Sequence, residues 1–170
     1  TEAIMNLILS INPDLDQLGL LDDLGQDSST QAIADAKAFC DEHGIRYIEK
    51  NGTNTAEVPM AVEALAASGV KVVFTPTDNT IMTAELAIYE TMIEAGIQHF
   101  PGADSFALKG AFVGYGGDYV QLGEATADIV AELPCDGKTI ADLPYRTLDN
   151  RRATINTADC PALGLDPETG

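Results

Sequence analysis

Val72-Val73-Phe74-Thr75-Pro76-Thr77-Asp78-Asn79-Thr80 is the stretch of sequence that decides the fold. The apolar run over residues 70–74 predicts a buried parallel strand, and residues 81–95 carry apolar side chains at helical spacing. Such a strand–turn–helix corner directs the free N–H groups of the helix over the edge of the sheet. The turn offers hydroxyl, carboxylate and amide groups but no common catalytic base or nucleophile. It therefore favours holding a small polar molecule over transforming one.

Strands and helices alternate around this stretch with short connections. Strands are predicted at residues 17–21, 46–50 and 97–100, and helices at residues 28–43 and 54–69. This alternation is typical of an α/β fold with a flavodoxin-like parallel sheet and helices on both faces. The pattern changes after Ser105, where we expect a strand at 111–113, a helix at 119–133, strands at 145–148 and 152–156, and a last helical turn at 157–163.

Composition and charge limit the class of protein. The chain has 170 residues and a formal net charge of −18, from 27 acidic and 9 basic residues. Nucleic acid and anionic membrane surfaces are poor partners for such a field, which instead suits the solubility of a secreted protein. No apolar run approaches the ~20 residues of a membrane span. Because Thr1 opens the chain inside a predicted helix, we expect a fragment whose beginning is missing.

Cysteines and histidines do not form a reactive or metal-binding pattern. Cys40 is predicted to be a buried thiol, while Cys135 and Cys160 either bridge two tail loops in an oxidising compartment or stay unbridged. His43 and His99 have no third ligand or nucleophile at sensible spacing, so both are predicted to be structural. The chain also lacks the G-x-G-x-x-G, Walker A and G-x-S-x-G motifs. We therefore expect no cofactor, no metal and no enzymatic activity.

A candidate ligand site follows from the predicted sheet. In a flavodoxin-like order, the crevice lies over the carboxyl ends of the first and third strands. Three loops converge there, at residues 23–29, 75–79 and 102–105. Two of them open helices, whose N–H groups suit a carboxylate, and the third carries Asp104, which suits an ammonium group. A zwitterion such as an amino acid would match this pairing.

The other predicted lining residues each have a structural alternative. Ser28 and Asn79, like Ser29, either line the site or only cap helices. Asp78 either faces the ligand or caps its own turn. Tyr115, between two glycines, is either a stacking surface for a ligand or a packing residue. Thr77 completes the predicted polar wall.

Several motifs resemble one protein family. The most specific is the turn Pro76-Thr77-Asp78-Asn79-Thr80, and it is followed by Asp104-Ser105 with Lys109-Gly110, and by Gly117-Asp118-Tyr119-Val120 with Leu122-Gly123. Together they resemble the C-terminal part of ABC-transporter substrate-binding proteins of the type I periplasmic-binding fold, in the branch associated with tryptophan and tyrosine. The resemblance covers about residues 1–165. One loop departs from it: residues 23–29 read Asp-Leu-Gly-Gln-Asp-Ser-Ser, where the family has Asn-Pro-Ser-Glu-x-Asn-Ser.

The resemblance implies a division of the chain and a mode of action. Residues 1–105 would form the C-terminal ligand-binding lobe, residues 106–143 would complete the N-terminal lobe, and residues 144–170 would return to the C-terminal lobe. Two lobes of this kind close on a small ligand, and the closed form docks on an ABC permease outside the cell or in the periplasm, where a lipid anchor holds the protein. The alternatives are a ligand-sensing regulatory domain of the same fold and a flavodoxin-like enzyme. Without its partner lobe, the segment 106–143 would favour self-association of this chain.

Overall fold

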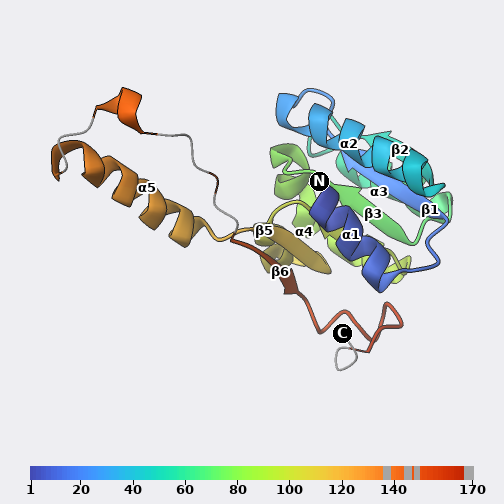
Figure 1. Cartoon of the computed structure of the whole chain (residues 1–170). Coiled ribbons are helices and arrows are strands. Elements are labelled where there is room, and N and C mark those ends of the chain that lie inside the picture. Colours follow the sequence, from blue (N-terminus) through green and yellow to red (C-terminus); the bar gives the residue numbers. More distant parts are fainter. Residues whose placement is uncertain (136–138, 144–146, 148–149, 167–170) are drawn as a thin grey trace. The chain divides into compact units, whose positions relative to one another are not determined.

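The computed structural model describes residues 1–135, 139–143, 147 and 150–166, with the backbone alone for residues 133–135. In chain order the elements are α1 (Glu2–Ile11), β1 (Gln17–Asp22), α2 (Asp27–His43), β2 (Arg46–Asn51), α3 (Val58–Ala67), β3 (Val72–Thr75), α4 (Asn79–Glu94), β4 (Gln98–Pro101), η1 (Asp104–Lys109), β5 (Val113–Gly117), α5 (Tyr119–Cys135), η2 (Ile140–Asp142) and β6 (Arg151–Ile155) (Figure 1).

The main sheet is parallel and has the order β2-β1-β3-β4. The chain runs outward from β1 to β2 and then crosses back to form β3 on the other side of β1. The register places Gly19 opposite Val73 and Leu20 opposite Phe74. Helices cover both faces (Figure 1). The predicted flavodoxin-like α/β fold is thus confirmed, and its switch point lies between the carboxyl ends of β1 and β3.

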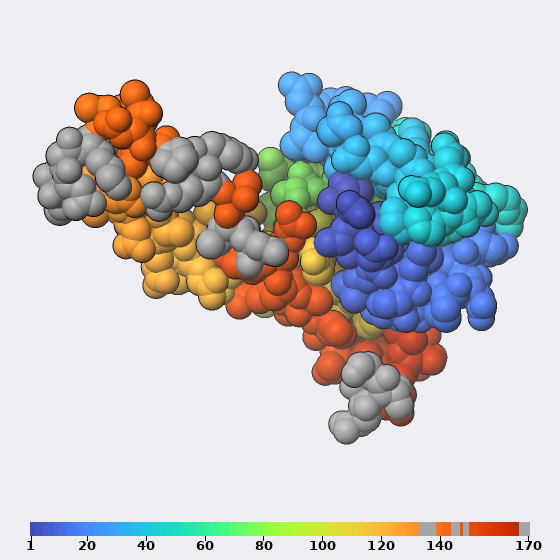
Figure 2. All heavy atoms as spheres, viewed as in Figure 1, coloured from blue at the N-terminus to red at the C-terminus, as the bar shows by residue number. Residues whose placement is uncertain are grey.

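Two apolar layers hold this sheet, one on each face. Because successive strand residues point to opposite faces, Leu20 and Phe74 pack against α1 and α2, whereas Val73 packs against α3 and α4. All three side chains are 0–1% exposed, and each contributes about 1.5–3 kcal/mol to stability through burial. The atoms of α1 lie next to those of α2 on one face (Figure 2).

The strand boundaries predicted for the main sheet lie close to the observed ones, although β3 begins at Val72 and not at residue 70, and the helix expected from residue 54 begins at Val58. The strand expected at 111–113 begins instead at Val113 and runs to Gly117. The helical turn expected at 157–163 consists of hydrogen-bonded turns without a helix. The strand predicted at 145–148 falls largely outside the described residues. Cys40 is buried as expected, and burial raises the pKa of its thiol to about 11. Cys160 is a buried free thiol, whereas the side chain of Cys135 lies outside the described part.

The chain divides into two compact units. Unit 1 comprises Thr1–Tyr115 and Ala153–Gly170, of which residues 153–166 are described, and unit 2 comprises Gly116–Arg152. The chain leaves unit 1 within β5 and returns to it within β6. In unit 2, the Asp118 carboxylate accepts the Val120 N–H at 2.9 Å at the start of α5 and pairs with Arg152 at 3.3 Å.

Helix α5 exposes apolar side chains that should make the chain associate with itself. Val120 is 72% exposed and Val130 is 57% exposed. Apolar surface of this kind is usually covered by a second chain. We expect light scattering to show dimers or larger species at micromolar concentration, and we expect Val120→Glu combined with Val130→Glu to shift them toward monomer.

The matched control for this association is Leu86→Glu, because Leu86 is similarly exposed, at 68%, but lies on α4. That variant should associate like the wild type. A wild-type chain that stays monomeric, with slow amide exchange throughout α5, would contradict the prediction.

Candidate ligand site at the carboxyl edge of the sheet

A buried carboxylate joins the first two loops of the predicted site. Asp78, 1% exposed, caps α4 because its Oδ1 accepts the N–H groups of Thr80 at 2.9 Å and Ile81 at 3.1 Å. Its Oδ2 accepts the Asp23 N–H at 2.9 Å and the Ser29 hydroxyl at 2.7 Å. The capping alternative for Asp78 is therefore what the structure shows. The same side chain locks the β1–α2 loop onto the β3–α4 turn.

Gln26 adds a second connection between the same two loops. Its Nε2 donates to the Thr80 hydroxyl at 2.8 Å, and its Oε1 accepts the Asn79 N–H at 3.2 Å. The Thr80 hydroxyl donates in turn to the Asp23 carboxylate at 2.7 Å. This bond and one from the Gly25 N–H hold the pKa of Asp23 below its usual range. Sequence reasoning did not single out Gln26, because no local motif marks a side chain that caps a distant helix.

These bonds correct one expectation about how the site would hold a carboxylate. The first three N–H groups of α4, from Asn79, Thr80 and Ile81, already have protein acceptors in Gln26 and Asp78. An anion therefore cannot use them without displacing those side chains. What this turn offers a ligand is its exposed side chains.

The third loop lies beside the β3–α4 turn, as predicted. The Gly102 N–H donates to the Thr75 carbonyl at 2.8 Å, and the Thr77 hydroxyl donates to the Gly102 carbonyl at 2.9 Å. Asp104 follows as the first residue of η1 and is half-buried. Strand β5 passes close behind it, because a Cβ added at Gly114 would lie 2.7 Å from the Asp104 Cα. The position of Asp104 thus depends on both the β3–α4 turn and β5.

The predicted lining residues fall into three groups. Ser28, Thr77 and Asn79 are exposed, and the Ser28 hydroxyl lies 3.5 Å from the Thr77 carbonyl, which brings the first two loops together. Asp78 is buried behind them. Tyr115 is half-buried and packs against the apolar layer that contains α1 and α2, so its packing alternative has support. Contact of any of these residues with a ligand remains a prediction.

Asp22, at the end of β1, is a titratable group that sequence reasoning did not select. It is 1% exposed, and its Oδ1 accepts a bond from the Asn51 side chain at 2.7 Å. Burial, and to a lesser extent the nearby Glu49 carboxylate, raise the pKa of Asp22 from 3.8 to about 6. The folded protein therefore binds this proton more tightly than the unfolded chain does. Its stability should fall as the pH rises from about 4 to about 6.

Asp22→Asn is expected to remove this pH dependence. A pKa difference of about 2 units corresponds to about 3 kcal/mol, so the variant should be more stable than the wild type at neutral pH by about 1–3 kcal/mol. Near pH 4 the two proteins should be nearly equal. Urea unfolding from about pH 4 to about pH 8 measures the difference. Asp14→Asn, at an exposed position, is the control, and a stability difference that does not grow with pH would refute the assignment.

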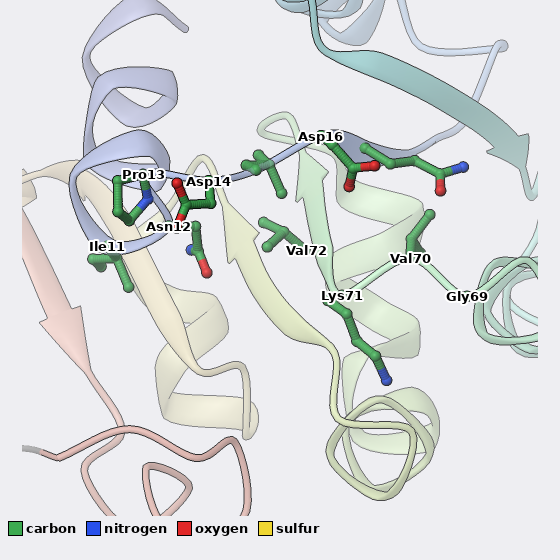
Figure 3. Close-up of a pocket in the computed structure, with 11 residues that line it drawn as sticks. Ile11, Asn12, Pro13, Asp14, Asp16, Gly69, Val70, Lys71 and Val72 are labelled. Carbon is green, nitrogen blue, oxygen red and sulfur yellow. The ribbon is translucent and has the colours of Figure 1, made fainter.

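A recess of about 390 Å³ lies at the opposite edge of the sheet, where β1 and β3 begin (Figure 3). Two of its charged side chains already have protein partners: Asp16 pairs with Arg46 at 2.8 Å, and Lys71 donates to the Ala95 carbonyl at 3.0 Å. Figure 3 shows the Lys71 side chain extending away from Asp14 and Asp16. Ligands of open α/β sheets bind at the carboxyl ends of the strands, so this recess is not the predicted site.

The described part of the chain contains no cluster of three or more His, Cys, Asp or Glu side chains placed to hold a metal ion. Among the described residues, no helix combines the length and the apolar composition that a membrane crossing requires.

The sheet order, the switch point and the polar loops at its carboxyl edge define a lobe of the type I periplasmic-binding fold. Residues 1–166 match the family model for "ABC transporter substrate binding protein", and the chain therefore belongs to that family. The proteins that this family model describes bind substrates for transporters and are not enzymes.

Relatives and solved structures are similar to this chain along almost its whole length. The chain is 23% identical to a tyrosine-binding protein of Clostridioides difficile over 164 residues, which are 96% of this chain and 47% of the relative. A conserved domain protein from Vibrio cholerae has a similar structure, with a TM-score of 0.83, 27% identity and coverage of 97% and 55% of the two chains. An ABC domain from Streptococcus pneumonia, solved in complex with L-Trp, gives a TM-score of 0.79 at 22% identity and coverage of 96% and 57%. The chain thus spans about half the length of these relatives.

Proposed function

We propose that this chain forms one wall of a site that binds a small zwitterion, most simply an amino acid, for an ABC importer. The observation that carries the proposal is that hydrogen bonds join three polar loops at the switch point. There Asp78 fixes two loops and the Thr77–Gly102 bond adds the loop of Asp104. The Asp104 carboxylate suits the amino group of the ligand, and the exposed Ser28 and Asn79 side chains suit its polar remainder. The tyrosine-binding relative and the L-Trp complex support an amino acid as the ligand class.

The rest of the site is proposed to come from a second lobe. We propose that residues 1–105 are the C-terminal lobe, that residues 106–143 complete the other lobe, and that residues 144–170 return to the first. The exposed apolar side chains of α5 support the assignment of this helix to the other lobe, because they require a covering partner. The two lobes would close on the ligand and deliver it to a membrane permease. This role places the protein outside the cell or in the periplasm, anchored as a lipoprotein.

Analogues that lack one charge test the proposal most directly. In the two-lobe protein, we expect L-tyrosine or L-tryptophan to raise the melting temperature, whereas the matching amine, without a carboxylate, and the matching deaminated acid should each raise it much less. Calorimetry then gives the affinities. A panel of sugars and nucleosides serves as the comparison. Stabilisation by a sugar or nucleoside, with none by any amino acid, would contradict the proposed ligand class.

A further inference from the structure

A network of three polar side chains is buried next to the candidate site. The Thr75 hydroxyl at the end of β3 lies 2.9 Å from Nε2 of His99 on β4, and Nδ1 of His99 lies 3.1 Å from Oε1 of Glu85 on α4. Their exposures are 0%, 2% and 0%. The ring of Phe106 in η1 meets the His99 ring edge-on, with the ring centroids 6.1 Å apart. Four elements thus meet around one imidazole.

Stability alone does not explain this arrangement. The Thr75 hydroxyl and Oε1 of Glu85 together occupy both ring nitrogens of His99. The second carboxylate oxygen, Oε2 of Glu85, is buried without a hydrogen-bond partner among the described residues. A buried acceptor in this condition lowers the stability of the fold. Apolar side chains of the same volume would fill this part of the core without leaving a polar atom unpaired.

The three residues are better explained by what they hold in place. Thr75 directly precedes the Pro76–Asp78 turn, and its carbonyl accepts the Gly102 N–H in the loop that leads to Asp104. His99 lies on the strand that enters the same loop. Glu85 lies on α4, whose first residue is Asn79. Each of the three residues therefore lies on an element that leads into the candidate wall, which is the set of polar loops at residues 23–29, 75–79 and 102–105.

We propose that Thr75, His99 and Glu85 are positioning residues that fix the β3–α4 turn and the Asp104 loop relative to each other, ready for a ligand. This inference rests on the proposed function, because positioning has a purpose only if those loops bind something. These three side chains lie behind the candidate wall and do not touch the ligand. Removal of one bond should loosen the two loops while the far end of the same strands stays intact.

Amide hydrogen exchange on the full chain tests the positioning without any ligand. Thr75→Val removes the hydroxyl at nearly constant volume, and Thr75→Ser restores it. We expect Thr75→Val to speed exchange of the Gly102 and Ile81 amides by about tenfold or more, and Thr75→Ser to return both to near the wild-type rates. The Gln98 N–H, bonded to the Lys71 carbonyl at the other end of the strands, is the internal control and should change less than about twofold.

The companion pair Glu85→Met and Glu85→Gln tests the contact between Glu85 and His99. Glu85→Met should reproduce the effect of Thr75→Val, whereas Glu85→Gln keeps an acceptor for His99 and should be milder. If Glu85→Met does not fold, the two Thr75 variants still decide the question. Equal acceleration at Gly102, Ile81 and Gln98 would show a general loss of stability and would overturn the proposal. So would unchanged rates in Thr75→Val.

Affinity for L-tyrosine and L-tryptophan in the two-lobe protein provides a separate result. Where the wild type binds, Thr75→Val should weaken binding about threefold or more and Thr75→Ser should not. Wild-type protein that binds neither amino acid would count against the proposed function. The exchange rates of the two loops would still decide whether the three buried side chains position them.

Discussion

Asp104→Ala should abolish or greatly weaken ligand binding by the two-lobe protein while the fold stays intact. Asp104 is the carboxylate proposed to meet the amino group of the ligand, at the start of η1 and beside the Thr77–Gly102 bond. Loss of one charge-assisted partner in a closed site typically costs about 2–5 kcal/mol, which is roughly 30- to 5000-fold in affinity. Calorimetry with the amino acid that binds the wild type most tightly measures this loss.

Two control variants separate a direct contact from a general disturbance. Asp35→Ala removes an exposed carboxylate from α2 and should leave the affinity unchanged. Asp104→Asn keeps the shape and an acceptor but removes the charge, so its affinity should lie between those of the wild type and Asp104→Ala. A change of less than about threefold for Asp104→Ala would remove Asp104 from the site.

The sequence predicted the sheet because β1, β3 and β4 are buried on both faces and the strands end at clear turn residues. Pro76 has no N–H group and ends β3, and Gly44 adopts a left-handed φ of 68° at the end of α2. The strand order and the meeting of three loops then follow from the rules for parallel sheets. Beyond the sheet such rules lose force. Strand β5 is rich in glycine, which has little strand propensity, and its predicted range was therefore displaced.

The details of the site could not be predicted, because they depend on residues distant in sequence. Ser28 or Ser29 was a good N-cap candidate for α2, yet Gln26 occupies that position and the Ser29 hydroxyl bonds to Asp78 instead. The bond between Gln26 and Asn79 joins residues 53 positions apart. His99 was correctly placed on a strand, but its partners come from β3 and α4. Local patterns identify which loops meet, whereas tertiary packing decides which side chains remain available to a ligand.

Asp78→Ala is expected to cause the largest loss of stability of the variants considered. It removes the cap of α4 and leaves the Ser29 hydroxyl and the Asp23 N–H unsatisfied in a buried place. A lost cap costs about 0.5–2 kcal/mol, and each unsatisfied buried group costs about 1–3 kcal/mol. We therefore expect the free energy of unfolding to fall by about 3–5 kcal/mol and the melting temperature by roughly 6–20 °C.

A graded series shows whether this loss comes from the buried side of Asp78 or from its cap. Asp78→Asn keeps an oxygen for the N–H groups of α4 but turns an NH₂ group toward the Asp23 N–H, which cannot accept it, so we expect a loss of about 1–3 kcal/mol. Asn54→Ala is the matched control, because Asn54 accepts the N–H groups of Ala56 and Glu57 at an exposed position, and its loss should stay below about 1 kcal/mol. Urea unfolding of all three variants tests this order. If Asp78→Ala costs no more than Asn54→Ala, Asp78 is only an N-cap. In that case it does not hold the β1–α2 loop against the β3–α4 turn, and the candidate wall needs another means of support.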